Sequence, residues 1–525
     1  MKHIMIGASA LALLAACGAD DEPKAKSLDS VKVEDIKIPS SNFKAKDYGK
    51  TSAALAALKL DGEASSPIKF ADSSTKNGGA VFSDVTITGD DGPALLAKKM
   101  SFDGLNMTDD GPTFDRLILS DMSMVDEEEG VNIAIGDISI VEPNAAASAF
   151  FAALIQGEDT EGTPNFGEWA FDSMSLKNLS LAAAPKDEEG AVSVSVGELT
   201  MASLADAVAG QTLFSNIKMD FDIPDAGDFP IKGSLNLDKM SLSNLQASFI
   251  DAFAEAGSDP EKLAGVNSQL MGNYTSPIDQ GYDQGVVEGL SLDVSGLSFS
   301  MPKSATKVVR NKDGVATSVV SPKTVFKLKA DAEGGQLGQQ LAQGLAMLDY
   351  SDLEFSVNAK ASYDPETKET RYSDYVIDMK DGFSLSFNGG AFNVLEMMQG
   401  MTENAEEPNM DALGQLKFSD MEISLKDKSL IDRAFKVAAE MQGMEPAQLK
   451  SMASGFLAMG TMQASQSGVD MELVNQTVTA LTSFIEDSGT LTIKMAPDAP
   501  VSMADFEDPS KLTADALGFS ATTKK

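Results

Sequence analysis

Carboxylates are the one reactive side-chain type that this sequence offers in large number, with 79 aspartate and glutamate residues in a chain of 525. Two carboxylates about 5 to 10 Å apart in a cleft can hydrolyse a glycosidic bond. Clefts that hold glycan are lined with aromatic side chains, whereas this sequence has one tryptophan, Trp169, and 6% aromatic residues. A carboxylate-dependent hydrolase acting on glycan is therefore the alternative function, and it is not the leading one.

Aspartate recurs at one position of a repeated strand-like motif. The five aspartates at this position are Asp84, Asp121, Asp352, Asp374 and Asp420. A catalytic acid is needed once, whereas a turn is needed in every repeat, so we interpret these residues as structural. The Asp-Asp-Gly-Pro loops at residues 89–93 and 108–112 lack the alternating ligand spacing of an EF-hand and are interpreted as turns. The sequence thus predicts no catalytic, cofactor-binding or metal-binding residue.

The single histidine and the single cysteine both lie near the N-terminus, at His3 and Cys17. A folded body without them cannot contain a Ser-His-Asp or Cys-His nucleophile system or a zinc site built on His and Cys. Glycine-rich spots such as Gly389-Gly390 lack the flanks and the lysine of a phosphate-binding loop. The formal charge of −38 excludes a nucleic-acid partner, because phosphates must be met by a basic surface. These counts favour a non-enzymatic protein.

The first seventeen residues have the pattern of a secretory signal: Lys2 and His3 are basic, residues 4–14 are apolar, and two alanines follow. The sequence Leu14-Ala15-Ala16-Cys17 resembles the lipobox of bacterial lipoproteins. That resemblance implies diacylglyceryl transfer to the Cys17 thiol, cleavage before it and acylation of the new amine. Residues 1–16 would be removed, which changes the formal charge to −39 because Lys2 is lost. A plain signal peptide with an incidental cysteine is the alternative.

Several features bear on location. In bacterial lipoproteins aspartate after the cysteine retains the protein at the inner membrane, so Gly18 implies the outer membrane and its periplasmic face, with the inner membrane as the alternative. Two or three acyl chains would hold the chain on a bilayer. No later apolar stretch reaches the roughly 18 to 20 residues of a membrane span. Residues 17–50 are expected to form an acylated cysteine and a flexible tether that ends in an edge strand.

A six-residue strand motif is repeated through the body. It begins with an aromatic residue or leucine, continues with a Ser/Asp pair and ends in two alternating apolar residues. Its occurrences begin at Phe82, Leu119, Phe171, Phe214, Tyr350, Tyr372 and Phe418. We expect the first residue to lie in the core, the Ser/Asp pair to form a turn or bulge, and the apolar residues to share one sheet face. A glycine inside the second strand of two units, Gly136 and Gly197, predicts a bulge or a close backbone approach.

The repeats predict an α+β fold: a long antiparallel β-sheet built from repeated strand-hairpin-strand-helix units, with helices packed on one face. Acidic hairpin tips separate the two strands of each unit. Helices are expected at residues 144–157, where Asn144 can cap the first turn, at 203–208, and at 245–257. Residues 51–280 are assigned to this ββα-type repeat region.

The remaining chain divides into two predicted segments. Residues 281–410 form a β-meander with strands at 290–301, 307–309, 325–328, 353–363, 371–379 and 383–387, a turn at 311–314 and a helix at 336–347. Residues 411–525 hold a strand, a helical segment and a final strand at 491–495. Ser429 and Asp432 predict a capping box, and Pro446 predicts the start of the next helix. This segment resembles the closing part of uncharacterised bacterial envelope proteins.

Methionine and phenylalanine are abundant, with 27 and 26 residues. Methionine packs irregular apolar surfaces well, so a sheet face that helices leave open could accept acyl chains; an ordinary methionine-filled core is the alternative. The repeated strands resemble those of AsmA-like envelope proteins with long β-grooves. We therefore expect a membrane-anchored envelope lipoprotein, non-enzymatic, structural or binding a hydrophobic lipid-like ligand. Its expected partners are the membrane, through the anchor, and that ligand.

Overall fold

The computed structural model describes residues 36–38, 43–62, 68–88, 94–126, 130–156, 165–184, 190–224, 230–256, 274–402, 410–464, 470–507 and 511–525. Its described residues form two compact units. The first unit contains residues 36–256 and 281–294, and the second contains residues 274–280 and 295–525. Cys17, the lipobox and most of the predicted tether lie outside the described residues.

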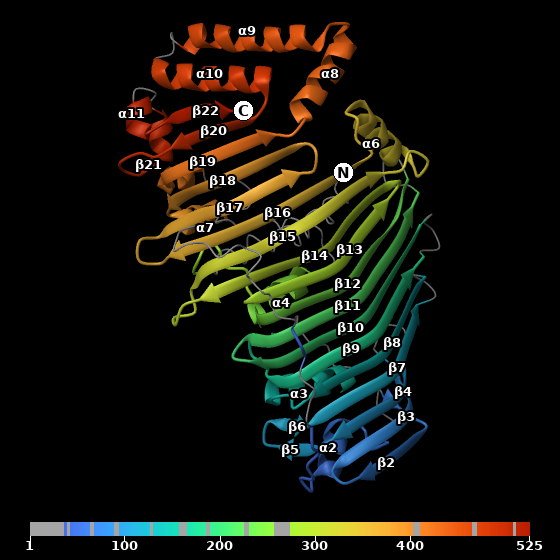
Figure 1. Ribbon diagram of the computed structural model, residues 1–525. Coiled ribbons are helices and arrows are strands. Elements are labelled where there is room, and N and C mark those ends of the chain that lie inside the picture. Colours follow the sequence, from blue (N-terminus) through green and yellow to red (C-terminus); the bar gives the residue numbers. More distant parts are fainter. Residues whose placement is uncertain are drawn as a thin grey trace. The chain divides into compact units, whose positions relative to one another are not determined.

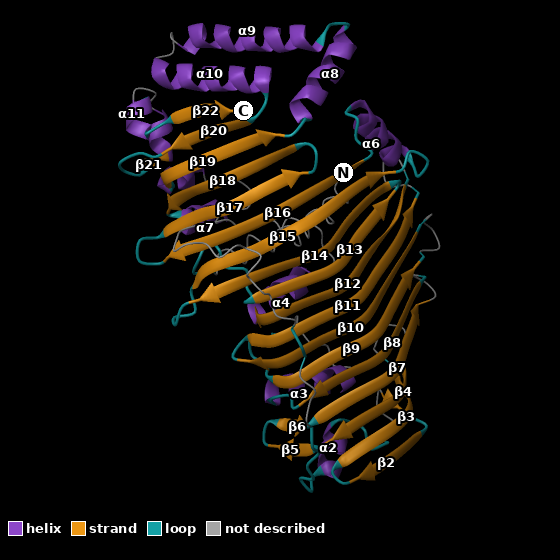
Figure 2. Ribbon diagram, in the orientation of Figure 1, coloured by secondary structure: helices purple, strands orange, loops and turns teal. Residues whose placement is uncertain are grey.

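The first unit is a twisted antiparallel sheet (Figures 1 and 2). Its strands are β1 (Ile68–Lys69), β2 (Asp72–Lys76), β3 (Gly79–Ile87), β4 (Leu95–Asp103), β7 (Arg116–Asp126), β8 (Val131–Val141), β9 (Phe171–Ala183), β10 (Ala191–Ala205), β11 (Val208–Ile223), β12 (Ile231–Gln246) and β13 (Gln284–Val294). Each strand from β3 to β13 pairs with the next one in this series, and β1 and β2 both pair with β3. A separate hairpin joins β5 (Asn106–Thr108) to β6 (Gly111–Thr113), so residues 109–110 form a turn, as predicted.

Three helices pack on the sheet near one set of strand ends. They are α2 (Thr51–Ala57), α3 (Ala145–Gln156) and α4 (Ala247–Ala256), and all three contribute to one apolar core with the strands. Asn144 caps α3 as predicted, because its Oδ1 accepts a hydrogen bond from the Ala147 N–H at 3.0 Å. The apolar core of the first unit therefore lies between these helices and the strand ends that they cover.

The helix predicted at residues 203–208 is wrong. β10 continues to Ala205 and leads directly into β11 at Val208, with these two residues paired. Asp206 and Ala207 have φ of +50° and +60°, so they form the two-residue left-handed turn that matches the twist of a hairpin. Helix propensity in this short stretch is overridden by strand pairing on both sides.

The second unit is also an antiparallel sheet with helices (Figure 2). Its strands are β14 (Leu297–Arg310), β15 (Ala316–Ala330), β16 (Asp352–Asp364), β17 (Glu369–Met379), β18 (Phe383–Phe392), β19 (Lys417–Asp427), β20 (Thr490–Met495), β21 (Val501–Ser502) and β22 (Ser520–Lys524). Its helices are α6 (Gln336–Met347), α7 (Val394–Thr402), α8 (Leu430–Gln442), α9 (Pro446–Ala464), α10 (Met471–Asp487) and α11 (Ala514–Leu517), with 3₁₀ turns η2 (Met410–Gln415) and η3 (Met503–Glu507). Strands β14 to β19 pair in chain order, β20 and β21 pair with β19, and β22 pairs with β20.

The second unit confirms some local predictions and corrects others. The helix at 336–347 and the start of α9 at Pro446 are as predicted. The single strand predicted at 290–301 is wrong, because β13 ends at Val294, β14 begins at Leu297, and the two residues between them have positive φ. The capping box of Ser429 is also wrong: the Ile431 N–H donates to Asp427 Oδ1 at 3.0 Å, while the Ser429 hydroxyl donates to the Asp381 carbonyl.

The fold class is confirmed at the level of a long antiparallel sheet with helices. The finer unit of strand, hairpin, strand and helix does not recur in every repeat, because β10 continues into β11 without a helix. The division into residues 1–16, 17–50, 51–280, 281–410 and 411–525 stays a prediction.

Candidate functional site: the apolar sheet face of the first unit

The side-chain alternation of the first sheet is interrupted once in each of several strands. Leu119 and Met122 are three residues apart, yet both are buried in the same core, although a regular strand would place them on opposite faces. Asp121 lies between them with φ of +51°. Two further strands have a left-handed residue at the equivalent position, Asn178 with φ of +53° and Asn216 with φ of +52°. The left-handed residue restores the following apolar residues to the core face.

Glycines lie opposite these left-handed residues. The pairing of Ser120 with Asp137 and of Met122 with Ile135 places Asp121 opposite Gly136. Gly197 lies in the same way opposite Asn216, and a Cβ at Gly197 would be 2.9 Å from the Asn216 Cβ. A Cβ at Gly136 would be 3.1 Å from the Asn178 Cβ. The two glycines of the sequence pattern therefore mark a close approach of neighbouring strands, as predicted.

Apolar residues that pair directly across the strands form continuous rows on one face. One row, next to the line of left-handed residues on the core side, consists of Leu119, Ile138, Leu176, Leu199, Phe214, Met240 and Val287. A second row lies beyond that line, toward the other strand ends, and consists of Met124, Ile133, Leu181, Val194, Met219, Leu235 and Leu292. We call this second row the outer apolar row.

Burial decreases from the core to the outer apolar row. Leu117, Ile140, Met201 and Leu242, close to the helices, are buried. Every side chain of the outer apolar row is only half-buried. The helices of the unit contribute to the core at the other strand ends. The outer apolar row is thus an apolar part of the sheet face that lies away from this core.

The opposite face of the same sheet is polar. The hydroxyls of Ser139 and Ser175 are 2.8 Å apart, and the Ser120 hydroxyl donates to Asp137 at 2.7 Å. Lys177 and Glu198 form an ion pair at 3.6 Å on neighbouring strands. Because one face carries hydroxyls and charges and the other carries aliphatic side chains, the apolar face is the one that can take an apolar ligand.

The repeated aspartates do not converge on one site. Asp84, Asp121 and Asp374 lie inside strands with φ of +51°. Asp352 is the first residue of β16, and Asp420 in β19 accepts a hydrogen bond from Arg371 at 3.0 Å. Of the three positions within strands, only Asp374 in β17 lies in a bulge, as predicted. In β3 and β7 the predicted turn or bulge is wrong, because pairing continues without a register shift on both sides of Asp84 and Asp121. No group of three or more His, Cys, Asp or Glu that could hold a metal ion occurs within the described ranges.

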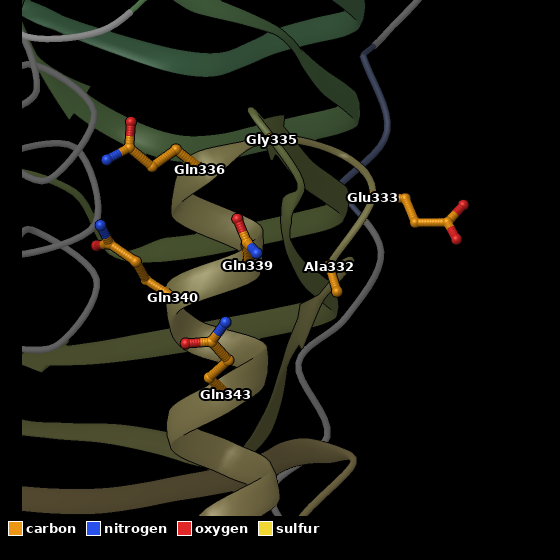
Figure 3. Close-up of a pocket in the computed structure, with 7 residues that line it drawn as sticks. All are labelled: Ala332, Glu333, Gly335, Gln336, Gln339, Gln340 and Gln343. Carbon is orange, nitrogen blue, oxygen red and sulfur yellow. The ribbon is translucent and has the colours of Figure 1, made fainter.

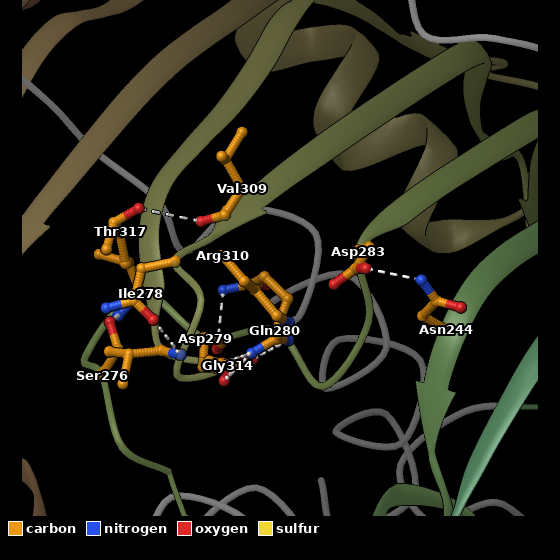
Figure 4. Close-up of polar contacts among 12 residues, drawn as sticks. Asn244, Ser276, Ile278, Asp279, Gln280, Asp283, Val309, Arg310, Gly314 and Thr317 are labelled. Carbon is orange, nitrogen blue, oxygen red and sulfur yellow. Dashed lines mark hydrogen bonds and ion pairs between the residues drawn. The ribbon is translucent and has the colours of Figure 1, made fainter. Parts of the chain in front are cut away.

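Sequence patterns gave no signal for one buried ion pair in the second unit. Arg310 donates from Nη1 and Nη2 to the two carboxylate oxygens of Asp279, at 2.6 and 2.7 Å (Figure 4). The exposed fractions of the two side chains are 18% and 3%. Burial, and then the nearby Asp279 charge, raises the pKa of Tyr274 to about 12, although Arg310 opposes the shift. This cluster joins residues 274–280 to β14.

Carboxylates elsewhere in the second unit are also neutralised. Arg371 donates to Glu369 at 2.8 Å and to Asp420, and the Ser419 hydroxyl donates to Glu369 at 3.0 Å.

Trp169, the only tryptophan, is buried among Phe150, Phe151 and Phe166 in the first unit's core. Acids held by arginine and a buried tryptophan do not favour a glycan-hydrolysing cleft.

A polar hollow of about 570 Å³ lies at the start of α6 (Figure 3). It is lined by Ala332, Glu333, Gly335, Gln336, Gln339, Gln340 and Gln343. Its lining holds one carboxylate and four amides, which can exchange hydrogen bonds with solvent but provide no acid and base pair. The hollow therefore does not support the hydrolase alternative.

Comparisons with known proteins add little. A family model described as an uncharacterized protein matches residues 376–524. No curated protein matches the chain. Among solved structures the chain is similar to OmpT (in-vitro folded), an outer membrane protein of Vibrio cholerae, with 9% identity, 60% of this chain and 78% of that chain covered, and a TM-score of 0.17. Within the described part of the chain, no helix has both the length and the hydropathy to cross a bilayer.

Proposed function

We propose that this chain is an envelope lipoprotein that binds a lipid-like ligand on the apolar sheet face of its first unit. The observation that supports the proposal is the outer apolar row, seven directly paired aliphatic or methionine side chains on seven strands, all half-buried. The chemistry of the row suits acyl chains, because it offers apolar contact and no hydrogen bonds.

The dimensions of the row fit this ligand class. Seven strands at about 4.8 Å spacing give a row about 29 Å long. One leaflet of a bilayer contributes about 15 Å of hydrocarbon, half of the roughly 30 Å core, so the row exceeds the length of one acyl chain. Each CH₂ group removed from water contributes about 0.8 kcal/mol, so several groups in contact suffice for measurable binding. The flexible methionines at both positions 124 and 219 can adjust to chains of different shape.

The anchor, the location and the repeat belong to the same proposal. We infer that Cys17 is acylated, that the mature chain is held at the periplasmic face of the outer membrane, and that its partners are that membrane and the bound lipid. The repeated strand motif supports an origin of the sheet in duplicated two-strand units, each of which adds to the apolar face.

The anchor is tested by Cys17→Ser. Because the thiol is the attachment point for the diacylglyceryl group, the variant is expected to leave the membrane fraction that contains the wild-type protein. Cell fractionation and metabolic labelling with a fatty acid measure this. Membrane retention with unchanged labelling would overturn the anchor.

The ligand is tested by mass spectrometry of the lipids that co-purify with a chain beginning at Gly18, which contains all described residues. A fluorescent fatty acid then serves as the binding probe. Leu235→Asn places a polar amide in the outer apolar row and is expected to weaken binding about tenfold. Ser234→Asn, one residue away on the polar face, is the matched control and should leave binding unchanged. Equal binding by both variants, or no co-purifying lipid and no probe binding, contradicts the proposal.

A further inference from the structure

Helix α9 differs in charge from the rest of the chain. Its 19 residues contain one charged side chain, Lys450, and no aspartate or glutamate, whereas the chain has 79 acidic residues in 525. Lys450 does not offer a free charge, because it donates to Asp432 at 2.6 Å and its side chain is 16% exposed. The exposed surface of α9 is therefore uncharged.

Apolar side chains occur on both faces of α9. α10 packs against β20 and β22, and α9 packs against α10, as the outermost helix of that stack in Figure 1. Leu449, Ala453 and Leu457 are half-buried on one face of the helix. On the other face Met452 is 43% exposed, Phe456 64% and Met459 59%. A surface helix normally has a polar outer stripe, so an apolar outer stripe indicates contact with something apolar.

Neighbouring helices of the same unit follow the normal pattern. α8 exposes Asp432, Lys436 and Glu440, and α10 exposes Glu472 and Glu486. Met441 at the end of α8 is the exception, with 75% of its surface exposed, directly before the turn into α9. We call Met452, Phe456 and Met459 the α9 outer face.

We propose that the α9 outer face inserts into the interface of a lipid bilayer. Methionine and phenylalanine side chains can enter the boundary between headgroups and acyl chains, which is how interfacial helices gain affinity. The absence of acids on α9 removes the repulsion that the rest of this acidic chain would have from anionic headgroups. Because Lys450 is neutralised, binding is expected to depend on apolar insertion and not on lipid charge.

A second copy of the chain fits this face less well. At about 200 Å² for each full side chain, the three residues expose roughly 330 Å². A stable protein interface buries about 800 Å² on each partner and requires complementary shape. A bilayer requires neither. The inference is independent of the lipid ligand proposed for the first unit, because it concerns a different surface.

Vesicle flotation tests the inference. A chain beginning at Gly18 lacks the anchor, so any flotation reports the folded body. It is expected to float with vesicles of phosphatidylethanolamine and phosphatidylglycerol and to change less than twofold when sodium chloride is raised to about 0.5 M, because insertion is not electrostatic. Phe456→Ser and Phe456→Glu are expected to lower binding about tenfold and by more than that, respectively. Leu154→Glu, a comparable exposed helix residue in the first unit, should have no effect.

Several outcomes overturn the inference. These are the absence of flotation by the wild-type chain, flotation of both Phe456 variants equal to that of the wild-type chain, and a wild-type dimer in sedimentation that Phe456→Glu abolishes while vesicles bind neither form. Circular dichroism should show the variants folded, since Phe456 is largely exposed. Failure here is distinguishable from failure of the proposed ligand site, because Leu235→Asn should float normally and Phe456→Ser should bind the fluorescent fatty acid normally.

Discussion

The two units use the same strand motif in different ways. In the first unit, the left-handed residues Asp121 and Asn216 face single residues on the next strand, and pairing continues on both sides of them. In the second unit, Ser373 and Asp374 lie opposite a single residue, Asn388, in a bulge of the ladder. The Asn388 Oδ1 accepts from the Asp374 N–H at 3.1 Å. A similar sequence thus keeps the apolar side chains on the core face without a bulge in one sheet, and forms a local bulge in the other.

An asparagine on the neighbouring strand accounts for the bulge in the second unit. In the first unit Gly197 lies opposite Asn216. Lys98, in contrast, lies opposite both Asp84 and Asp121. None of these positions shows a register shift, so no extra residue is needed with either kind of neighbour. Where the neighbour is an asparagine, its side chain takes the backbone hydrogen bond and the ladder shifts by one residue. The local structure of this motif can therefore be predicted only together with the residue that faces it on the neighbouring strand.

The largest expected difference between the two units is in the free energy of unfolding that is lost when one ion pair of each unit is broken. Arg310→Ala leaves the Asp279 carboxylate, 3% exposed, without its main cation and should lower the free energy of unfolding by about 3 kcal/mol. Arg116→Ala in the first unit breaks a pair with Asp103 whose side chains are 35% and 29% exposed, so about 1 kcal/mol or less is expected. Urea unfolding followed by circular dichroism measures both.

Controls separate the two units in that experiment. Trp169 lies in the first unit's core, so its fluorescence should be unchanged by Arg310→Ala at urea concentrations where circular dichroism already changes. Removing both charges, with Arg310→Ala and Asp279→Ala together, should cost less than the sum of the single changes. Equal losses from Arg310→Ala and Arg116→Ala would remove the proposed contrast.

A smaller effect is expected at the left-handed line. Asp121→Val places a β-branched residue at φ of +51° and should lower the free energy of unfolding by about 1 to 2 kcal/mol, because only Gly, Asn and Asp adopt this conformation readily. Asp121→Asn controls for the lost charge and should be nearly neutral. Asp352→Val, at the same motif position but without positive φ, should also be nearly neutral. Trp169 fluorescence during urea unfolding measures the first unit, and a large loss from Asp352→Val contradicts the explanation.

The smallest effect concerns alkaline pH and is confined to the second unit. The folded pKa of Tyr274 is raised to about 12 by burial, whereas the unfolded value is 10.0. Between these values the folded chain holds a proton that the unfolded chain loses, so stability falls as pH rises from 10 to 12. The wild type should lose about 1 kcal/mol more than Tyr274→Phe between pH 9 and pH 11 in urea unfolding. Identical losses would show that Tyr274 does not contribute.

The sequence predicted the parts of the fold that depend on local patterns. Residues 336–347 have the predicted helix bounds, and Asn144 caps α3, because a cap and an apolar period are local signals. The helix predicted at 203–208 failed because pairing with β11 determines that stretch. The line of left-handed residues has a signal in the sequence, the three-residue step from Leu119 to Met122, but the motif alone predicts only a turn or bulge at the Ser/Asp pair.

Contacts between distant residues were not predictable in the same way. Asp279 and Arg310 are 31 positions apart, and no period or motif connects them before residues 274–280 pack on β14. The half-burial of the outer apolar row depends on where the helices end, which alternation alone does not specify. The sequence also could not predict which side of α9 is exposed, because apolar residues occur on both sides of that helix.

Two of the three side chains of the α9 outer face are methionines, at positions 452 and 459. An exposed thioether is readily oxidised to a sulfoxide, which is polar and can be reduced again by methionine sulfoxide reductases. The apolar character of this face can therefore be removed and restored by redox chemistry without any change of sequence. A face built from leucine would have the same hydropathy and no such reversibility.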